Sequence, residues 1–262
     1  MENTTSSLNW NDVAREVSSN LIIFDAVYKV RPGETSSRIW RYAYGDDYPE
    51  EVEPYSFITR TDLERIAHLL AIGSGSVLAD LGCGRGGPGL WLARKTGADL
   101  IGIDQSSNAI VQANQRIIEF GLVGRARFMQ GDLSATGLPD QSCDGAVSVD
   151  VVMFIQDKST VMRETARILR PGTHFIFTAF EGRDAELYRT PLCDNGFDVE
   201  VYEEKPDWHR RQLAIYEKTV AEQGALIEEM GEGAQPLISE AKFMLADGLV
   251  NTRHVFVVGR KM

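Results

Sequence analysis

The feature that most constrains the fold is the stretch 77–89, where an apolar run passes directly into a cluster of glycines. Val77–Leu81 has the length and composition of a buried parallel strand. The glycines that follow it are Gly82, Gly84, Gly86, Gly87 and Gly89. Pro88 stands where a helix would begin, and Leu90–Ala93 supplies the apolar side of that helix. A strand, a glycine loop and a helix in this order form a nucleotide site at the carboxyl edge of an open α/β sheet.

Asp80 indicates which nucleotide the loop would bind. Gly82, Gly84 and Gly87 satisfy the GxGxxG pattern of dinucleotide sites, but a pyrophosphate favours helix N–H groups with no fixed anion beside it. An acid two residues before the first glycine suits a ligand that carries an ammonium and a sulfonium. The pattern Asp-x-Gly-x-Gly-x-Gly therefore favours S-adenosylmethionine (SAM) over NAD, and the alternative is an ordinary tight turn without a ligand.

Two further acids follow the next two predicted strands. Asp104 ends the strand Asp99–Asp104 and lies about 20 residues after the glycine loop, where an acid binds ribose hydroxyls in doubly wound nucleotide folds. Asp132 follows the strand Arg125–Gln130, although Gly131-Asp132 taken alone would indicate only a turn. Three successive strands that each end in an acid are more specific than any one of them, and they strengthen the prediction of a SAM site.

These motifs resemble the class I SAM-dependent methyltransferases, in which Asp-x-Gly-x-Gly-x-Gly is the first motif. The segment Asp144–Asp150, a following helix and the turn Leu169–Gly172 are similar to the later motifs of small-molecule methyltransferases of the ubiquinone/menaquinone-biosynthesis and sterol type. The resemblance covers residues 60–205 well and the ends loosely. It implies that Asp132 binds the adenine amino group and that the next backbone N–H, that of Leu133, binds a ring nitrogen.

The predicted cofactor site combines the glycine loop with the ends of the neighbouring strands. The expected cofactor is SAM, with S-adenosylhomocysteine as its product, and the cysteines show no metal-binding spacing. The expected cofactor-binding residues are Asp80, Gly82, Cys83, Gly84, Gly86, Asp104, Gln105, Gly131, Asp132, Leu133 and Val149.

The whole sequence predicts an α/β fold, a Rossmann-like doubly wound sheet of seven mostly parallel strands. The expected strands beyond the third are 144–150, 174–179, 197–202 and 254–258. Helices are expected over 206–230 and 235–249, within an insertion of about 205–250 that would cap the nucleotide edge together with the N-terminal segment. We expect a helical lid of residues 1–60 and a SAM-binding domain of residues 61–262.

The first 60 residues show no strand pattern. Trp10–Val30 has the helical spacing of apolar residues. Tyr44 and Tyr48 belong to a following segment rich in aromatic and acidic residues, which is either packing or a lid that closes over cofactor and acceptor. Thr61 and Glu64 have the spacing of a capping box and predict the start of a helix.

Methyl transfer from a sulfonium requires the nucleophile to be held in line, and it requires a base only for a hydroxyl or a protonated amine. The loop Val151–Phe154 predicts a dry wall beside the reacting methyl, where relatives often carry a polar group. His209 is the first candidate base, although a lone histidine at a helix start is more often a surface residue; Asp150 and Glu181 are the other candidates. The candidate acceptor-binding residues are Tyr44, Tyr48, Met153, Phe154, Tyr202, Trp208 and His209.

Composition limits the class of partner. The formal net charge of −11 disfavours a nucleic-acid backbone as the main partner. Apolar content of 43% and charged content of 25% are typical of a soluble globular protein, and no apolar stretch is long enough to span a bilayer. The cysteines are scattered and the first residues lack a signal-peptide pattern, so we expect a reduced, cytoplasmic protein, monomeric or homodimeric, that acts on a small-molecule acceptor.

Three functions compete at this point. The first is methylation of a small, largely apolar metabolite such as a natural-product intermediate. The second is an NAD(P)-dependent oxidoreductase, which Asp80, Asp132 and the lack of a Tyr-x-x-x-Lys pair disfavour. The third is a SAM-fold protein that no longer methylates, either a binding module or a cyclase. Nucleic-acid methylation is disfavoured because the chain lacks an Asn/Asp-Pro-Pro-Tyr motif and a Pro-Cys after the fourth strand.

Overall fold

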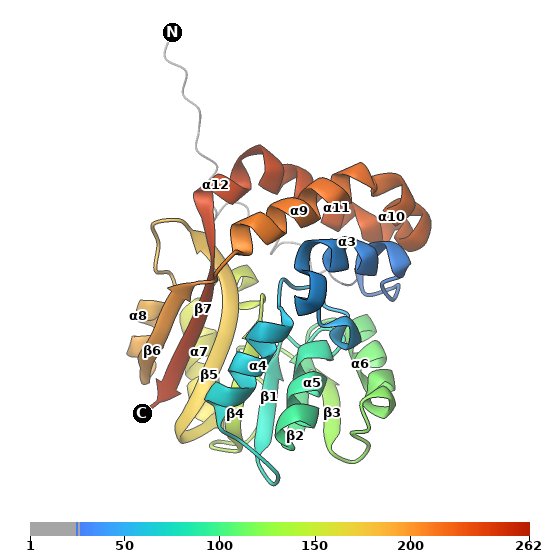
Figure 1. Ribbon diagram of the computed structural model, residues 1–262. Coiled ribbons are helices and arrows are strands. Elements are labelled where there is room, and N and C mark those ends of the chain that lie inside the picture. The colour runs from blue at the N-terminus through green and yellow to red at the C-terminus, as the bar shows by residue number, and fades with distance from the viewer. Residues whose placement is uncertain (1–24, 26) are drawn as a thin grey trace.

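A single seven-stranded sheet organises the protein in the computed structural model, which describes residue 25 and residues 27–262 (Figure 1). The strand order is β3-β2-β1-β4-β5-β7-β6, and only β7 runs antiparallel to its neighbours. The strands are β1 (Val77–Leu81), β2 (Asp99–Asp104), β3 (Ala126–Gln130), β4 (Cys143–Val149), β5 (Leu169–Gly182), β6 (Phe197–Glu204) and β7 (Thr252–Lys261). The predicted Rossmann-like, mostly parallel sheet is confirmed.

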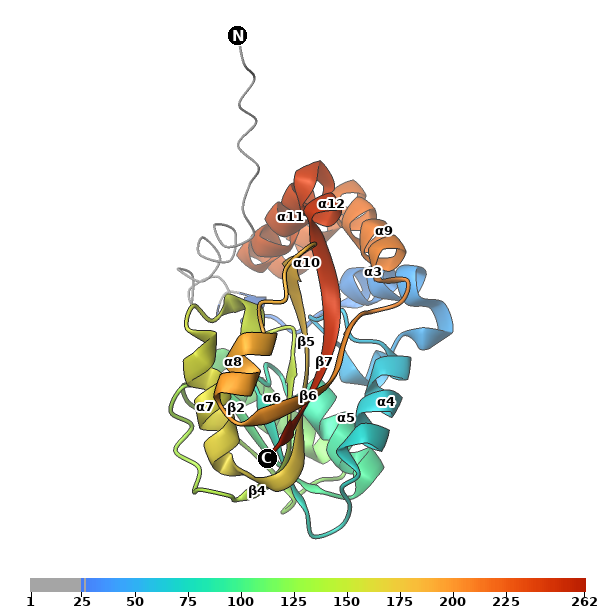
Figure 2. The ribbon, with the colours of Figure 1, turned by 90° about the vertical axis from the view of Figure 1, so that its left-hand side faces the viewer.

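Helices cover both faces of this sheet, which Figure 2 shows edge-on between α4 and α5 on one side and α7 and α8 on the other. One face carries α4 (Arg60–Leu70), α5 (Gly87–Thr96) and α6 (Ser107–Glu119), and the other carries α7 (Lys158–Ile168) and α8 (Arg189–Asp194). Successive residues of β1 point to opposite faces of the sheet. Leu78 packs in the core with α4 and α5, while Ala79 packs in the core on the α7 face. Burial on both faces explains why the strands read as continuous apolar runs.

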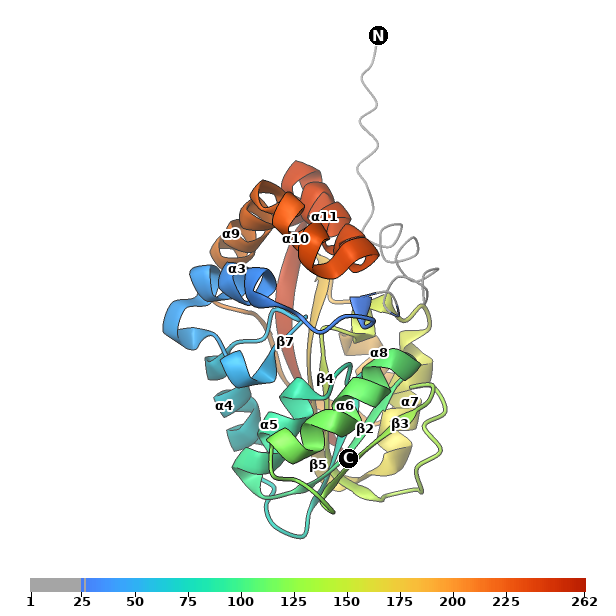
Figure 3. The same ribbon diagram turned by 90° about the vertical axis from the view of Figure 1, so that its right-hand side faces the viewer.

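A helical cap lies above the carboxyl edge of the sheet (Figures 1 and 3). Its helices are α3 (Glu34–Tyr44), α9 (Trp208–Ala221), α10 (Gln223–Met230), α11 (Ala234–Phe243) and α12 (Leu249–Asn251), with the 3₁₀ turns η1 (Gly45–Asp47), η2 (Glu50–Val52) and η4 (Gly231–Gly233) and the π-helical segment η5 (Met244–Gly248). Glu229 joins the two parts of the chain, because it accepts hydrogen bonds from the backbone N–H of Gly33 at 3.0 Å and of Thr35 at 2.8 Å. The predicted cap of N-terminal segment and insertion is therefore present.

Several boundaries differ from those predicted. β1 and β2 match the sequence prediction, while β3 and β4 are shifted by one residue at one or both ends. The predicted turn Leu169–Gly172 already belongs to β5, because Leu169 pairs with Cys143 before a bulge. The helix predicted over 206–230 is two helices, because Glu222 leaves the helical conformation ahead of Gly224, a residue of low helix propensity. The helix predicted over Trp10–Val30 lies almost wholly outside the described residues.

The capping box predicted from Thr61 and Glu64 is wrong by two residues. Thr59 is the N-cap of α4: its side chain accepts the Asp62 N–H at 3.1 Å, and Asp62 accepts the Thr59 N–H at 3.0 Å. The spacing rule was correct but Asp62, a shorter acid, fills the role that was given to Glu64. No helix in the described part of the chain is long and apolar enough to cross a membrane.

Candidate functional site

The glycine loop takes the shape that its sequence predicted. Gly82, Gly84 and Gly86 have φ of 78°, 51° and 76°, in the left-handed region that residues with a Cβ rarely adopt. Gly86 is the N-cap of α5, so the loop delivers the chain directly into that helix. A Cβ on Gly82 would lie 2.5 Å from the Val151 side chain, so the loop and the segment after β4 are in close contact.

Asp80 is buried beside the start of α5, with only 1% of its surface exposed. Its Oδ2 accepts the backbone N–H of Gly89 at 3.1 Å. Burial raises the pKa of Asp80 to about 7, the Gly89 N–H opposes the shift, and the negative charge of Asp104 adds to it. A carboxyl group in this position gains from a cationic ligand, which would lower its pKa again.

Asp104 lies at the end of β2 and receives two backbone N–H groups. Gly84 donates to one carboxylate oxygen at 2.8 Å and Ser106 donates to the other at 2.9 Å. Burial raises the pKa of Asp104, and these N–H groups hold the shift back. Each carboxylate oxygen accepts more than one hydrogen bond, so the group retains capacity for a pair of ligand hydroxyls. Ser106 also caps α6, because its hydroxyl accepts the Ala109 N–H.

Asp132, the acid that follows β3, has different surroundings from Asp80 and Asp104. Asp104 is level with Gln130 in the sheet, so Gly131 and Asp132 follow at the same edge. Asp132 is exposed, and its Oδ1 accepts both the N–H and the hydroxyl of Ser134 at 2.8 Å, which makes a local turn. Its role toward adenine stays a prediction. Of the other residues expected at the cofactor, Cys83, Leu133 and Val149 are buried, Gly131 is half-buried and Gln105 is exposed.

A tyrosine that the sequence did not single out lies against the glycine loop. The Oη atom of Tyr28 is 2.6 Å from the place where a Cβ on Gly84 would stand. Asp25 anchors the same segment to α6, because it accepts hydrogen bonds from the Ser106 hydroxyl at 2.7 Å and from the Asn108 amide at 3.0 Å. The N-terminal segment therefore crosses the predicted cofactor site, and only its tyrosines at other positions had been proposed as lid residues.

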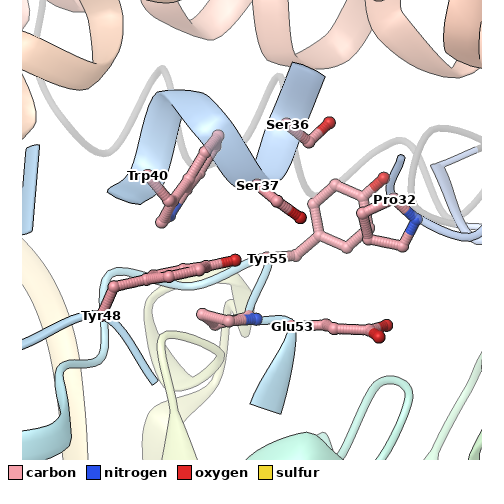
Figure 4. A pocket seen from close by; sticks show the side chains of 8 residues that line it. Pro32, Ser36, Ser37, Trp40, Tyr48, Glu53 and Tyr55 are labelled. Carbon is pink, nitrogen blue, oxygen red and sulfur yellow. The ribbon is translucent and has the colours of Figure 1, made fainter. Parts of the chain in front are cut away.

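Tyr48, a predicted lid residue, and Tyr55 in the same segment have different neighbours. Figure 4 shows Tyr48 below Trp40 of α3, while Tyr55 lies beside Pro32. Tyr55 also meets Tyr28 edge-on, with ring centroids 5.8 Å apart, and the Arg85 guanidinium lies 4.4 Å from its ring centroid. Tyr55 thus connects the N-terminal segment to the glycine loop, whereas Tyr48 packs within the cap.

The three candidate bases have very different surroundings. His209 is exposed on α9, so its proposed role as a base finds no support in this geometry. Glu181 is fully buried, and both of its carboxylate oxygens already accept hydrogen bonds. The donors are Arg253 at 2.8 Å, the Tyr202 hydroxyl at 2.6 Å and the Leu187 N–H at 2.8 Å. This network makes Glu181 and Tyr202 structural partners, and it leaves Asp150 as the remaining candidate.

Asp150 is the centre of a buried polar cluster that sequence reasoning did not find. It accepts the Nε2–H of His254 at 2.7 Å, the Phe57 N–H at 2.7 Å and the Thr178 hydroxyl at 2.6 Å. Burial alone would raise the pKa of Asp150, but the contact with His254, the charge of Lys205 and the Thr178 bond hold it well below its ordinary value. Asp150 is therefore a fixed anion that orients its neighbours, and its φ of 56° is a strained conformation at this point.

His254 stands at the start of β7, at the same edge of the sheet. Its ring is fully buried and stacks on Phe180 with centroids 4.5 Å apart. Burial and the charge of Lys205 lower the pKa of His254 and Asp150 opposes them, so the net shift disfavours the charged imidazole. Its Nδ1 faces the Gln212 amide at 3.3 Å. A histidine inside the apolar strand pattern 254–258 was the one sequence signal that could have pointed to this cluster.

The segment after β4 is apolar and largely buried, while its place beside the reacting methyl stays a prediction. Val152 and Met153 in η3 (Val152–Phe154) are buried and Phe154 is half-buried. Met153 accepts the Phe180 N–H on its sulfur at 3.3 Å. Because Val151 contacts Gly82 and Asp150 belongs to the polar cluster, this short segment links the glycine loop to the space under the cap.

That space is a cavity of about 100 Å³ between α3, α4, α9 and β7. Its lining includes Tyr44 and Trp208, which were predicted to bind an acceptor, together with Lys205, Gln212 and His254, which were not. Tyr48, Met153, Phe154, Tyr202 and His209 do not line it. Within residue 25 and residues 27–262, no group of three or more acid, histidine or cysteine side chains is arranged to hold a metal ion.

Comparisons with known proteins agree with this geometry. Residues 79–177 match a family model described as a methyltransferase domain, and this stretch includes the glycine loop, Asp104 and Asp132. The methyltransferase GfsG of Streptomyces halstedii is 35% identical over 131 residues, which are 50% of this chain and 47% of that protein. The sterol 24-C-methyltransferase erg6 of Aspergillus fumigatus is 29% identical over 154 residues, which are 59% of this chain and 38% of that protein.

The chain thus spans less than half the length of these curated relatives. Among solved structures, the (4+2) cyclase SpnF superposes with a TM-score of 0.68 at 21% identity, over 76% of this chain and 80% of SpnF. The protein therefore has the Rossmann-like α/β fold of the methyltransferases. The resemblance to class I SAM-dependent methyltransferases of the small-molecule type is confirmed.

Proposed function

We propose that the protein is a SAM-dependent methyltransferase that acts on a small molecule. The observation that carries this proposal is the pair of acids at the carboxyl ends of β1 and β2, of which Asp80 is buried and Asp104 half-buried. Asp80 and Asp104 meet the glycine loop through backbone N–H bonds of 3.1 Å and 2.8 Å, and burial raises the pKa of each. Two partly desolvated carboxyl groups disfavour a pyrophosphate and favour a cationic adenosyl donor.

The proposed reaction depends mainly on position. SAM supplies an electrophilic methyl group, and the protein holds the acceptor in line with it at about 3–3.5 Å, an arrangement that contributes roughly 7–11 kcal/mol to lowering the barrier. Asp104 would accept the ribose hydroxyls, Asp80 would face the cationic end, and the wall Val151–Phe154 would exclude water. Tyr28 would cover the nucleoside from the N-terminal side.

The acceptor is proposed to be a small, largely apolar metabolite, because the segment that touches the glycine loop after β4 is apolar and its Val152 and Met153 belong to the hydrophobic core. We propose residues 1–60 as the lid and residues 61–262 as the SAM-binding domain, in a cytoplasmic monomer or homodimer. Oxygen, nitrogen and carbon acceptors are all compatible with this wall.

A SAM-fold cyclase is the second candidate. The (4+2) cyclase SpnF has the same fold, with a TM-score of 0.68. The matching domain model and the relatives that are named methyltransferases favour methylation. Release of S-adenosylhomocysteine during turnover separates the two, since a rearrangement would leave the methyl group on sulfur.

Calorimetric titration of the purified full chain with SAM tests the proposal, and titration with NADH is the control. We expect SAM to bind and NADH to give no fluorescence transfer from the four tryptophans. Tight NADH binding without SAM binding would replace the proposal with an oxidoreductase.

A further inference from the structure

Tyr44, the last residue of α3, lines the cavity under the cap with a hydroxyl group that has no partner. Only 6% of the residue is exposed, and its hydroxyl forms no hydrogen bond within residue 25 and residues 27–262. It is not among the unpartnered polar atoms that are fully enclosed, so the oxygen keeps an accessible surface. A tyrosine hydroxyl at this depth normally has a partner, so an accessible one without a partner points to a ligand.

The charges around this hydroxyl place it in the cavity. Burial raises the pKa of Tyr44 well above its ordinary value, and the negative charge of Asp150 adds to the shift. Further charges that act on the hydroxyl are those of Asp62, Arg211 and Asp47, and all three residues line the same cavity. The hydroxyl therefore lies among cavity-lining groups. It keeps its proton near neutral pH, so it can donate a hydrogen bond to a ligand there.

Two cations in the cavity wall add further hydrogen-bond donors. Lys205 contacts Asp62 at 2.8 Å and donates to the Phe57 carbonyl at 2.9 Å, which uses two of its three N–H groups. Arg211 contacts Asp47 at 2.6 Å through one of its nitrogens. Each cation retains N–H groups beyond these contacts, so the wall of the cavity is rich in donors.

The charge of the lining favours a neutral ligand. The cavity is lined by three aspartates, Asp47, Asp62 and Asp207, and by the two cations, so with an uncharged His254 the lining has a net negative charge. An anion is repelled by this charge. A cation gains little, because Asp47 and Asp62 already have cationic partners. A neutral group that accepts hydrogen bonds fits both conditions.

The cavity is small and lies beside the predicted SAM site without being part of it. Its volume of about 100 Å³ is less than the roughly 150 Å³ of a cavity that holds benzene in another protein, so it takes a group of a few atoms. None of the residues predicted to bind SAM lines it. Phe57, which does, donates its N–H to Asp150, and the next residue, Val151, touches the glycine loop at Gly82.

We infer that this cavity binds a neutral group through a carbonyl oxygen, which accepts a hydrogen bond from the Tyr44 hydroxyl. The carbonyl belongs to the methyl acceptor or to a separate small ligand held between the cap and the sheet, and only the first of these sources rests on the proposed methyltransferase function. A group of the same shape without the oxygen binds more weakly, because the Tyr44 hydroxyl then stays without a partner.

The experiment uses cyclobutanone and methylenecyclobutane as probes, because the two rings have the same shape and only the ketone oxygen accepts a hydrogen bond. Dissociation constants are measured by NMR on the full chain labelled with ¹⁵N at tryptophan. The indole of Trp208, which lines the cavity, reports binding and is assigned with Trp208→Phe. We expect Tyr44→Phe to weaken cyclobutanone binding about fivefold or more and to leave the affinity for methylenecyclobutane unchanged.

Tyr42→Phe, at an exposed tyrosine of the same helix, is the matched control and should keep both affinities. Because the Tyr44 hydroxyl has no partner in the protein, Tyr44→Phe should melt within about 2 °C of the wild type. A clearly lower melting temperature would show a structural partner and overturn the inference. An unchanged affinity for cyclobutanone in Tyr44→Phe, or an equal loss for both probes, would overturn it as well.

Two wild-type measurements decide without any variant at Tyr44. Cyclobutanone should shift the Trp208 signal, and acetate, a small anion, should not. No shift with cyclobutanone would overturn the site, and acetate binding as tight as that of the ketone would overturn its preference for a neutral group.

SAM carrying ¹³C in its methyl group distinguishes the two sources of the carbonyl. Cyclobutanone shifts the signal of the bound methyl group if the cavity holds part of the methyl acceptor, and leaves it unchanged if the cavity holds a separate ligand. If SAM fails to bind while the Tyr44 effect is present, only the methyltransferase proposal fails. If SAM binds and the Tyr44 effect is absent, only the inference about the cavity fails.

Discussion

The two halves of the sheet's carboxyl edge use aspartates in opposite ways. At β1 and β2, Asp80 and Asp104 receive backbone N–H groups and burial raises their pKa values. Beyond β4, Asp150 receives a histidine, a threonine hydroxyl and a backbone N–H, and its pKa is lowered. Acids that lack a cationic partner are prepared for a cationic ligand, whereas an acid saturated by side chains becomes a support for its neighbours.

The largest effect on stability should come from removing Asp150, the acid that supports the polar cluster beyond β4. Asp150→Ala leaves the His254 N–H, the Phe57 N–H and the Thr178 hydroxyl buried without their acceptor, and we expect a loss of about 3–5 kcal/mol in the free energy of unfolding. Asp132→Ala, at an exposed acid, should change it by no more than about 0.5 kcal/mol. Urea titrations followed by circular dichroism measure both. A loss below about 1 kcal/mol for Asp150→Ala would show that the cluster is not a support.

The contact between the two halves predicts the next largest effect. Gly82→Ala forces a Cβ against Val151 at φ 78°, while Gly124→Ala has almost the same φ, 79°, and nothing within 4 Å. Both should lose roughly 1 kcal/mol to backbone strain. Overpacking should cost Gly82→Ala about 1–3 kcal/mol more. Equal melting temperatures for the two variants would mean that the glycine loop and the segment after β4 do not touch.

A moderate effect should appear in the pH dependence of SAM binding beside the glycine loop. Because the pKa of Asp80 is about 7 in the free protein, a cationic donor binds its ionised form better, and binding lowers that pKa. SAM affinity should therefore increase about tenfold from pH 6 to pH 8, with proton release below pH 7. Calorimetry in buffers of different ionisation enthalpy measures both quantities. Asp80→Asn should flatten the profile, and an unchanged slope in that variant would place the titration elsewhere.

The smallest effect should come from the histidine that the sequence favoured. His209→Ala removes an exposed side chain and should change the free energy of unfolding by no more than about 0.5 kcal/mol. His254→Ala opens a buried site between Asp150 and Phe180 and should lose more than about 2 kcal/mol. Thermal unfolding of the two variants side by side compares them, and equal losses would remove the distinction between the two histidines.

The comparison of the two halves of the edge also shows which of their features could be predicted from the sequence. The glycine loop was predictable because strand, loop and acid are contiguous in 77–89, and a local pattern carries their geometry. The polar cluster was not, because Phe57, Asp150, Gln212 and His254 come from four distant segments that only the folded sheet and cap bring together. Glu181 was chosen for its place near the end of a strand, but its saturation by Arg253 and Tyr202 depends on β6 and β7 packing beside it.

Calorimetric titration of SAM into the wild type and into Asp104→Ala tests the central claim most directly. The claim is that acids at neighbouring strand ends bind a cationic adenosyl donor. We predict at least a tenfold loss of affinity in Asp104→Ala, about 1.4 kcal/mol or more, because both contacts to the ribose hydroxyls are removed. Equal SAM affinity in the two proteins, each shown to be folded, would contradict it.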